Sequence, residues 1–207
     1  QQCIEALKAL GFIAGDAYLI REMEGTQLVS MHQGPICAVV YQHPIAGAWV
    51  DMVLNEVDGK EFTVSNAPMG ASIDAPDNTV KIMDPSLTVQ DIFSKIKEIK
   101  QNSEVQYELI NEQNFRKFFE DAYKKDMAWR IRKGGITYEE FVNTSTESNI
   151  KSSDKNLRGA FIEMKESDLY HWQAAALEHY RKTNKIEFEA FCEDEYRLIV
   201  VPFTTAA

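Results

Sequence analysis

Short runs of β-branched and aromatic residues, separated by turn-forming residues, fill the first third of the chain. These runs fall at residues 17–23, 27–31, 36–43, 48–57 and 60–66. Runs of this length, broken at short intervals by Gly, Pro and Asp, are typical of an antiparallel sheet. Asp58-Gly59, between the last two runs, predicts a two-residue type I′ turn, which requires positive φ at both central positions. We therefore predict an antiparallel meander of about five strands between residues 17 and 66.

Beyond residue 80 the apolar positions recur at three- and four-residue steps, which indicates helices. A brief sixth strand at residues 80–83 precedes a predicted helix at 89–100, which Thr88 and Asp91 open as a capping box. The clearest helical pattern spans residues 111–133. A second capping box, from Thr137 to Glu140, opens a short helix, and another short helix is predicted at residues 3–12. The separated strands and helices predict an α+β fold in which the helices at 89–100 and 111–133 cover a face of the meander.

The second half of the chain contains one stretch, residues 143–154, that is polar and lacks periodicity. Such a stretch is typical of a loop and is the best place for a boundary. We therefore divide the chain into an α+β domain of meander and helices at residues 1–142, this polar loop, and a C-terminal part at 155–207. The last part is predicted to form a helix and a β-hairpin that pack on the same domain or form a small second lobe.

Composition and charge narrow the classes of partner. The 207 residues are 44% apolar and 26% charged, as in an ordinary globular protein, and their net charge is −10. An acidic chain is a poor binder of nucleic acid, whose phosphates require cations. One basic cluster could meet phosphates or an anionic membrane surface, but cations in the last turns of a helix also stabilise its dipole, and we favour that reading. The cluster consists of Lys124, Lys125, Arg130, Arg132 and Lys133.

Membrane association is expected only through a segment missing from this chain. The sequence has no run of 18 apolar residues and no signal peptide. Because it begins with Gln1 rather than Met, we expect that an upstream segment is missing. That segment is as much expected to be a membrane anchor or signal as to be neither. The three cysteines, Cys3, Cys37 and Cys192, are odd in number and widely spaced, unlike a disulfide framework. Unpaired cysteines favour a cytoplasmic or cytoplasm-facing location, and a membrane-anchored full-length form is compatible with it.

A nucleophile set is one candidate for catalysis. Cys37 and His43 lie six residues apart on one predicted strand, about 20 Å from end to end, so only His32, across a turn, could reach the thiol. Asp51 on the next strand could complete a Cys-His-Asp arrangement. The alternative, which we favour, is that Cys37 is a core residue whose burial raises its pKa.

Other candidates are a binding loop and a carboxylate cluster. The Pro-containing loop after the central hairpin offers Asn66, Met69 and Asp74 as ligand-binding residues, although turn chemistry explains each of them equally well. Glu163, Glu166, Asp168 and His171 could share a helix face, but solvated helices show the same residues, so we expect no metal. Trp49 and Trp129 are predicted to be core anchors. No glycine-rich phosphate loop is present, and we expect no cofactor.

The runs Gly11-Phe12, Trp49-Val50-Asp51, Asp58-Gly59 and Ser65-Asn66-Ala67 resemble the soluble parts of bacterial membrane-anchored proteins. The resemblance implies no activity and no residue roles. We expect a non-catalytic binding or interaction domain with a protein or small-molecule partner, the soluble part of a larger or membrane-anchored protein. The alternative is a small cysteine-dependent, hydrolase-like enzyme that uses Cys37 and His32.

Overall fold

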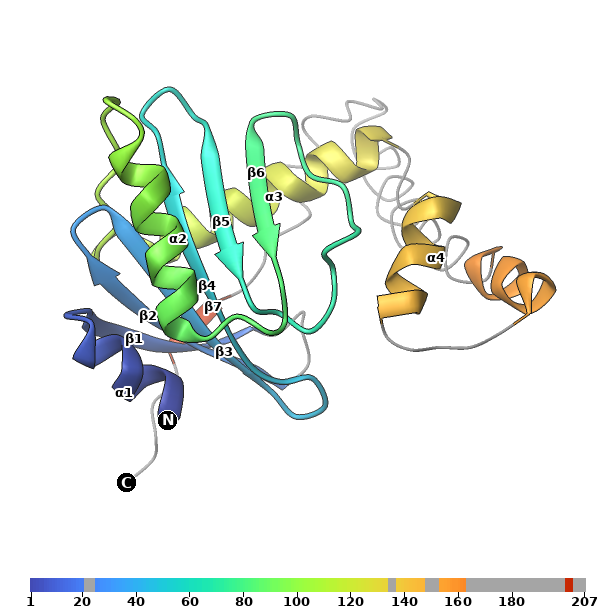
Figure 1. Ribbon diagram of the computed structural model, residues 1–207, viewed down its shortest axis with the longest axis horizontal. Helices are drawn as coiled ribbons and strands as arrows, with labels where there is room; N and C mark the ends of the chain where they lie inside the picture. The colour runs from blue at the N-terminus through green and yellow to red at the C-terminus, as the bar shows by residue number, and fades with distance from the viewer. Residues whose placement is uncertain (21–24, 134–136, 148–152, 163–199, 203–207) are drawn as a thin grey trace, which may run out of the picture. The chain divides into compact units, whose positions relative to one another are not determined.

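The computed structural model describes residues 1–20, 25–133, 137–147, 153–162 and 200–202 (Figure 1). The named helices are α1 (Gln2–Ala9), α2 (Val89–Gln101), α3 (Phe115–Lys133) and α4 (Tyr138–Glu147), and residues 154–162 are also helical. The strands are β1 (Ile13–Ile20), β2 (Thr26–Gln33), β3 (Ile36–His43), β4 (Gly47–Asn55), β5 (Glu61–Ser65), β6 (Thr79–Met83) and β7 (Val200–Pro202). The predicted α+β class with an antiparallel meander is confirmed.

One sheet contains all of these strands, in the order β6-β5-β4-β3-β2-β1-β7. β1 to β5 form the antiparallel meander, and β7 adds to β1, also antiparallel. The predicted sixth strand is present, but it pairs parallel to β5. The reason is the long connection at residues 66–78, which returns the chain to the starting end of β5 before β6 begins, as a parallel pair requires.

The turn between β4 and β5 differs from the predicted two-residue type. The backbone N–H of Gly59 donates to the carbonyl of Glu56 at 2.8 Å, and the N–H of Glu56 donates to the carbonyl of Lys60 at 2.8 Å. Residues 57–59 therefore form a three-residue loop, in which Gly59 has a φ of +94°. This is the pattern of a turn followed by a bulge, where only the glycine needs positive φ. The Asp-Gly signal located the hairpin correctly, but the predicted turn type was wrong.

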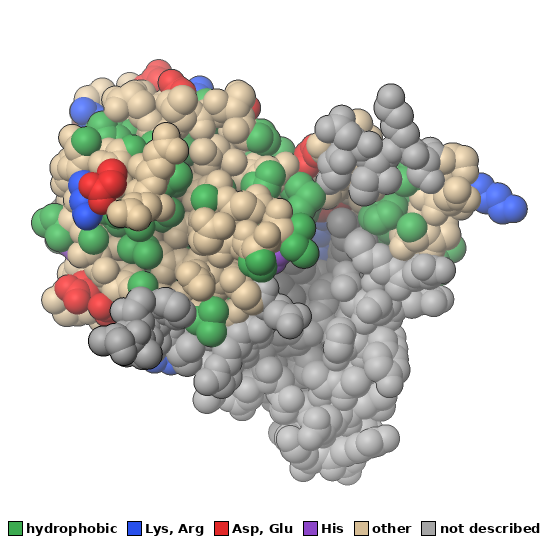
Figure 2. Space-filling view, turned by 90° about the horizontal axis from the view of Figure 1, so that it is seen from below, with side chains coloured by type: hydrophobic (Ala, Val, Ile, Leu, Met, Phe, Trp, Pro, Cys, Tyr) green, Lys and Arg blue, Asp and Glu red, His purple; other side chains and the backbone are tan. Residues whose placement is uncertain are grey.

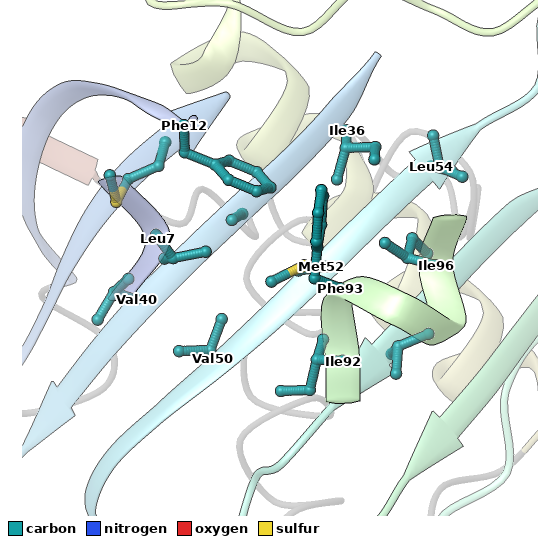
Figure 3. Close-up of a cluster of buried hydrophobic side chains, with 13 residues drawn as sticks. Leu7, Phe12, Ile36, Val40, Val50, Met52, Leu54, Ile92, Phe93 and Ile96 are labelled. Carbon is teal, nitrogen blue, oxygen red and sulfur yellow. The ribbon is translucent and has the colours of Figure 1, made fainter. Parts of the chain in front are cut away.

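The main core lies on the face of the sheet that α1 and α2 cover (Figures 1 and 3). Val50, Met52 and Leu54 alternate along β4 and point toward these helices, because successive side chains of a strand point to opposite faces. Figure 3 shows that Leu7 of α1 and Ile96 of α2 extend into the same cluster. The capping box predicted at the start of α2 is present, since the side chain of Thr88 accepts from the Asp91 N–H and the Asp91 side chain accepts from the Thr88 N–H.

The opposite face of the sheet packs against the first turns of α3. The ring of Tyr18 lies 5.4 Å from that of Phe115, and the ring of Tyr41 lies 6.4 Å from that of Phe119. Tyr41 alternates with Val40, which belongs to the core on the first face. The prediction that both long helices cover one face was therefore wrong, since the sheet is covered on both faces. All six residues from Ile36 to Tyr41 are buried, a pattern typical of a strand covered on both faces.

α4 begins as predicted but ends later. Thr137 and Glu140 form the second capping box through reciprocal bonds of 2.7 and 3.2 Å. The helix then continues to Glu147, so the loop predicted from residue 143 was wrong for its first part. The hydroxyls of three polar residues are satisfied within the helix, because each donates to the carbonyl four residues earlier, at 2.8–2.9 Å. These residues are Thr144, Ser145 and Thr146.

The chain divides into two compact units. The first contains residues 1–71, 75–120 and the described end of the chain, 200–202; the second contains residues 72–74 and the described residues from 121 to 162. Most of the predicted C-terminal helix and hairpin lies outside the described residues, so the division at residues 143–154 stays a prediction. Within the described part of the chain, every helix is too short or too polar to cross a membrane.

Candidate functional site

A groove of about 460 Å³ opens on the first unit, where β2, β3 and β4 extend past the first turn of α1. Its volume falls within the range of small-molecule sites, about 300–1,000 Å³. The described residues that line it are Gln1, Gln2, Cys3, Ile4, Gln27, Leu28, Val29, Val40, Tyr41, Gln42 and Ala48. Along this part of the sheet the described residues of α1 cover only part of the apolar face.

The described side chains that line this groove are uncharged. Among its described lining residues there is no Asp, Glu, Lys or Arg. Ile4, Val29 and Val40 supply apolar surface; Val40 belongs to the main core, and Ile4 and Val29 pack against it. Four amide side chains, each with donors and an acceptor, are mostly exposed around this surface. They are Gln1, Gln2, Gln27 and Gln42. Sequence reasoning missed this site, although Gln27 with Val29 and Val40 with Gln42 stand two apart on neighbouring strands and so share a face.

On the side of the first unit that carries this groove, few of the described side chains are charged. In Figure 1 the start of α1 and the β3–β4 turn lie at the bottom, and Figure 2 views the protein from that side. Hydrophobic and uncharged polar groups make up most of the described surface in that view. The turn itself exposes Ile45 to 91%, and its backbone is fixed by His43, whose Nδ1 accepts from the N–H groups of Ile45 and Ala46 at 3.1 and 3.0 Å.

On the opposite face, Cys37 and His32 are direct cross-strand partners in the β2–β3 register. The prediction that only His32 could reach Cys37 agrees with this register. The thiol, however, is 1% exposed, and burial raises the pKa of Cys37 to about 12. At neutral pH it is a thiol, and a thiol is a poor nucleophile compared with its thiolate.

Asp51 lies on the same face and forms a small polar network. The hydroxyl of Ser65 donates to Asp51 Oδ1 at 2.5 Å, and the backbone N–H of Ala67 donates to Ser65 Oγ at 2.9 Å. Burial raises the pKa of Asp51 to about 6, although hydrogen bonds from Ser65 and Tyr41 and the charge of Lys81 lower it. The carboxyl therefore changes its charge near neutral pH.

The three candidate catalytic residues share a face but stand in the wrong order for a triad. In the register, His32 of β2 faces Cys37 of β3, and Asp51 of β4 lies diagonal to Cys37. A triad requires the imidazole between the nucleophile and the carboxylate. Here the cysteine stands between the other two, so Asp51 is not placed to orient His32.

The loop candidates have different surroundings. Asn66 is tied into the sheet, because its Oδ1 accepts from the N–H of Val50 at 2.7 Å and its Nδ2 donates to the carbonyl of Leu87 at 3.0 Å. Met69 is 50% exposed. Asp74 belongs to the second unit and pairs there with Lys133, at 2.5 Å. The three residues therefore do not form one site.

The second unit contains a buried ionic centre around Glu140. Its carboxylate is paired with Lys133 at 2.7 Å and accepts from the N–H groups of Thr137 and Asp74 at 2.7 and 2.8 Å. Burial alone would raise the pKa of Glu140, but these hydrogen bonds outweigh it and hold the pKa at about 2. Nearby, Ser72 donates its backbone N–H and its hydroxyl to Glu147. The centre fixes residues 72–74 to α3 and α4.

The predicted basic cluster is only partly described. Lys133 is the member that the structure places in this ionic centre, where burial lowers its pKa but the hydrogen bonds from its ammonium to Asp74 and Glu140 prevail and raise it. Lys125 is exposed and Lys124 is half-buried. The side chains of Arg130 and Arg132 lie outside the described residues.

The remaining candidates are aromatic and metal-binding. Trp49 is partly exposed and stacks on Tyr41, with ring centroids 4.8 Å apart, while Trp129 lies under the ammonium of Lys133. Within the described residues no group of His, Cys, Asp and Glu is arranged to hold a metal ion. The cluster proposed at Glu163, Glu166, Asp168 and His171 lies outside the described residues, as does Cys192.

Comparison of the chain with protein-family models, with curated proteins and with solved structures found no match.

Proposed function

We propose that the first unit is a non-catalytic binding domain and that its ligand occupies the groove beside α1. One observation carries this proposal: the groove combines a volume of about 460 Å³ with an apolar base and a rim of hydrogen-bonding amides. Small-molecule sites have this composition, with apolar walls that supply affinity and a few polar groups that fix orientation.

The environment of Cys37 supports a binding domain over a cysteine-dependent enzyme. The alternative has one favourable observation, the cross-strand pairing of Cys37 with His32. Against it stand the burial of the thiol, its raised pKa of about 12 and the position of Asp51 on the far side of Cys37. The groove lies on the opposite face of the sheet from this pair, so neither residue supplies chemistry to a ligand bound there.

The experiment is a ligand titration followed by backbone NMR. Three octyl probes that differ only in their head group, octanamide, octanoate and octylammonium, are titrated below their aggregation concentrations. We expect at least one probe to shift the amide signals of Gln27, Val29 and Gln42. If none of the three shifts these signals, or if the shifts fall on other parts of the sheet, the proposal is wrong.

A steric variant tests whether the groove itself is occupied. Ala48 is exposed at the start of β4 and lines the groove, so Ala48→Trp should fill it and abolish binding. Val57→Trp is the matched control, because Val57 is 61% exposed just beyond the other end of the same strand. Gln27→Trp provides a second blocked variant if Ala48→Trp fails to fold. Unchanged binding in a folded, blocked variant would exclude the groove as the site.

A further inference from the structure

The ligand class follows from the charges that the groove lacks. A quarter of the chain is charged, and its net charge is −10, yet the described residues lining the groove include no Asp, Glu, Lys, Arg or His, and the phenol of Tyr41 points to the opposite face of the sheet. A charged ligand would lose hydration on entry and gain no ion pair from these side chains. The lining side chains therefore offer no ion pair to an anion or to a cation.

The rim specifies what the ligand must carry instead. Gln27 and Gln42 face each other across the β2–β3 register, at the ends of the apolar strip that Val29 and Val40 form. An amide side chain both donates and accepts, so two such groups match a head group that also does both. A ligand group with only acceptors or only donors could use only one of the two functions of each amide.

We infer that the groove binds an uncharged aliphatic molecule whose head group both donates and accepts hydrogen bonds, as a primary carboxamide does. The inference rests on the proposed function of the groove. The aliphatic chain lies along Val29, Val40 and Ile4, and the head group pairs with Gln27 and Gln42. Burial of the chain supplies the affinity, and the glutamines supply the preference among head groups.

The test compares the dissociation constants of the same three octyl probes. The probes share the same octyl chain and differ only in the head group, so the ratio of their dissociation constants reports the effect of the head group. We expect octanamide to bind at least about tenfold more tightly than octanoate and octylammonium, because the two ions must be desolvated without a partner. The thiol of Cys3 provides a second readout, since it lines the groove and is partly exposed. Bound octanamide should slow its reaction with a thiol reagent in a Cys192→Ser background.

A charge placed on the rim should reverse the preference. Gln42→Glu adds a carboxylate beside the head group, so it should tighten the binding of octylammonium several-fold and weaken that of octanoate. Gln113→Glu is the matched control, since Gln113 is an exposed glutamine of the same unit that does not line the groove. The control should leave all three constants nearly unchanged.

The outcomes separate this inference from the proposed function. Octanoate or octylammonium binding in the groove as tightly as octanamide would overturn the ligand class and leave the binding domain intact. If none of the three probes binds in the groove, both the ligand class and the proposed binding function are wrong. An equal effect of Gln42→Glu and Gln113→Glu would show that the rim does not contact the head group and would also overturn the inference.

Discussion

The ionic centre of the second unit predicts a specific loss of stability in acid. Glu140 is almost fully enclosed, with 4% of its side chain exposed, and receives one ammonium and two backbone N–H groups. Protonation of this carboxyl would leave Lys133 with one carboxylate fewer and would weaken the bonds to residues 74 and 137. Replacing Glu140 by Gln removes the same charge at every pH and keeps the size of the side chain.

The magnitude follows from the pKa of Glu140, which falls from an ordinary 4.5 to about 2. A depression of this size stabilises the folded state by about 3 kcal/mol once the carboxyl is ionised in both the folded and the unfolded chain. Because the pKa of Glu140 is lower in the folded chain than in the unfolded chain, the free energy of unfolding falls as the pH falls. The stabilisation is fully present above pH 4.5 and is lost as the pH falls from 4.5 toward 2.

The measurement is urea unfolding followed by far-UV circular dichroism, for the wild type and for Glu140→Gln, from neutral pH down to about pH 2.5. Other carboxyls titrate in both proteins, so the difference between their free energies of unfolding isolates Glu140. We expect a difference of about 3 kcal/mol at neutral pH that shrinks toward zero at the acid end.

The control for this experiment is Glu139→Gln. Glu139 is the exposed neighbour of Glu140 in the first turn of α4 and makes no described contact with Lys133. Its removal should cost only a few tenths of a kcal/mol, as an acid at a helix start does. A difference curve for Glu140→Gln that is flat with pH, or that matches the control, would refute the account of the centre.

Three further predictions concern the first unit. In the native protein Cys3 should react with a thiol reagent much faster than Cys37, and rapid labelling of Cys37 at neutral pH would instead favour the cysteine-dependent enzyme. Cys37→Ala should lower the free energy of unfolding by on the order of 1 kcal/mol, and Cys37→Ser should lower it more because it buries a hydroxyl. Asp51 has a folded pKa of about 6, above its ordinary 3.8, so its contribution is present below pH 3.8 and is lost as the pH rises through 6. Asp51→Asn should therefore gain stability relative to the wild type between pH 4 and 8, by on the order of 1–2 kcal/mol because the side chain is partly exposed. A difference in stability between the variant and the wild type that does not change with pH would contradict the raised pKa of Asp51. Asn66→Ala should lower the free energy of unfolding in urea by about 2 kcal/mol, because two hydrogen bonds are lost. Asn66→Asp should cost less, because it keeps the acceptor for the Val50 N–H and loses only the donor to the Leu87 carbonyl. The reverse order would mean that the bond to Leu87 contributes more than the bond to Val50.

Local signals in the sequence were sufficient for the elements and for most of the sheet. The two capping boxes, at Thr88 and Thr137, located the starts of α2 and α4, because the reciprocal bonds that define such a box need only four consecutive residues. The short spacing of the strands gave the meander for the same reason. The thiol of Cys37 was correctly predicted to be buried from the apolar residues of its own strand.

Features that depend on distant parts of the chain could not be predicted in the same way. The parallel pairing of β6 is decided by where the loop at residues 66–78 returns, which no local pattern encodes. The cluster of Asp74, Lys133 and Glu140 brings Asp74 to two residues that lie 59 and 66 positions later in the sequence. The groove is lined by residues 1–4 together with residues of β2, β3 and β4, so it depends on the packing of several elements rather than on a pattern within any one of them.

The strand β7 has a consequence for any attempt to shorten this protein. β7 pairs with β1, although the two strands lie more than 170 residues apart in the sequence. The edge of β1 in the first unit is therefore covered by residues 200–202. A fragment that stops after residue 120 would keep β1 but expose its row of backbone donors and acceptors along residues 18–20. Such a bare edge recruits strands from other molecules and promotes aggregation. A shortened version that keeps this edge covered must therefore carry the last strand with it, joined back by a linker or supplied as a separate peptide.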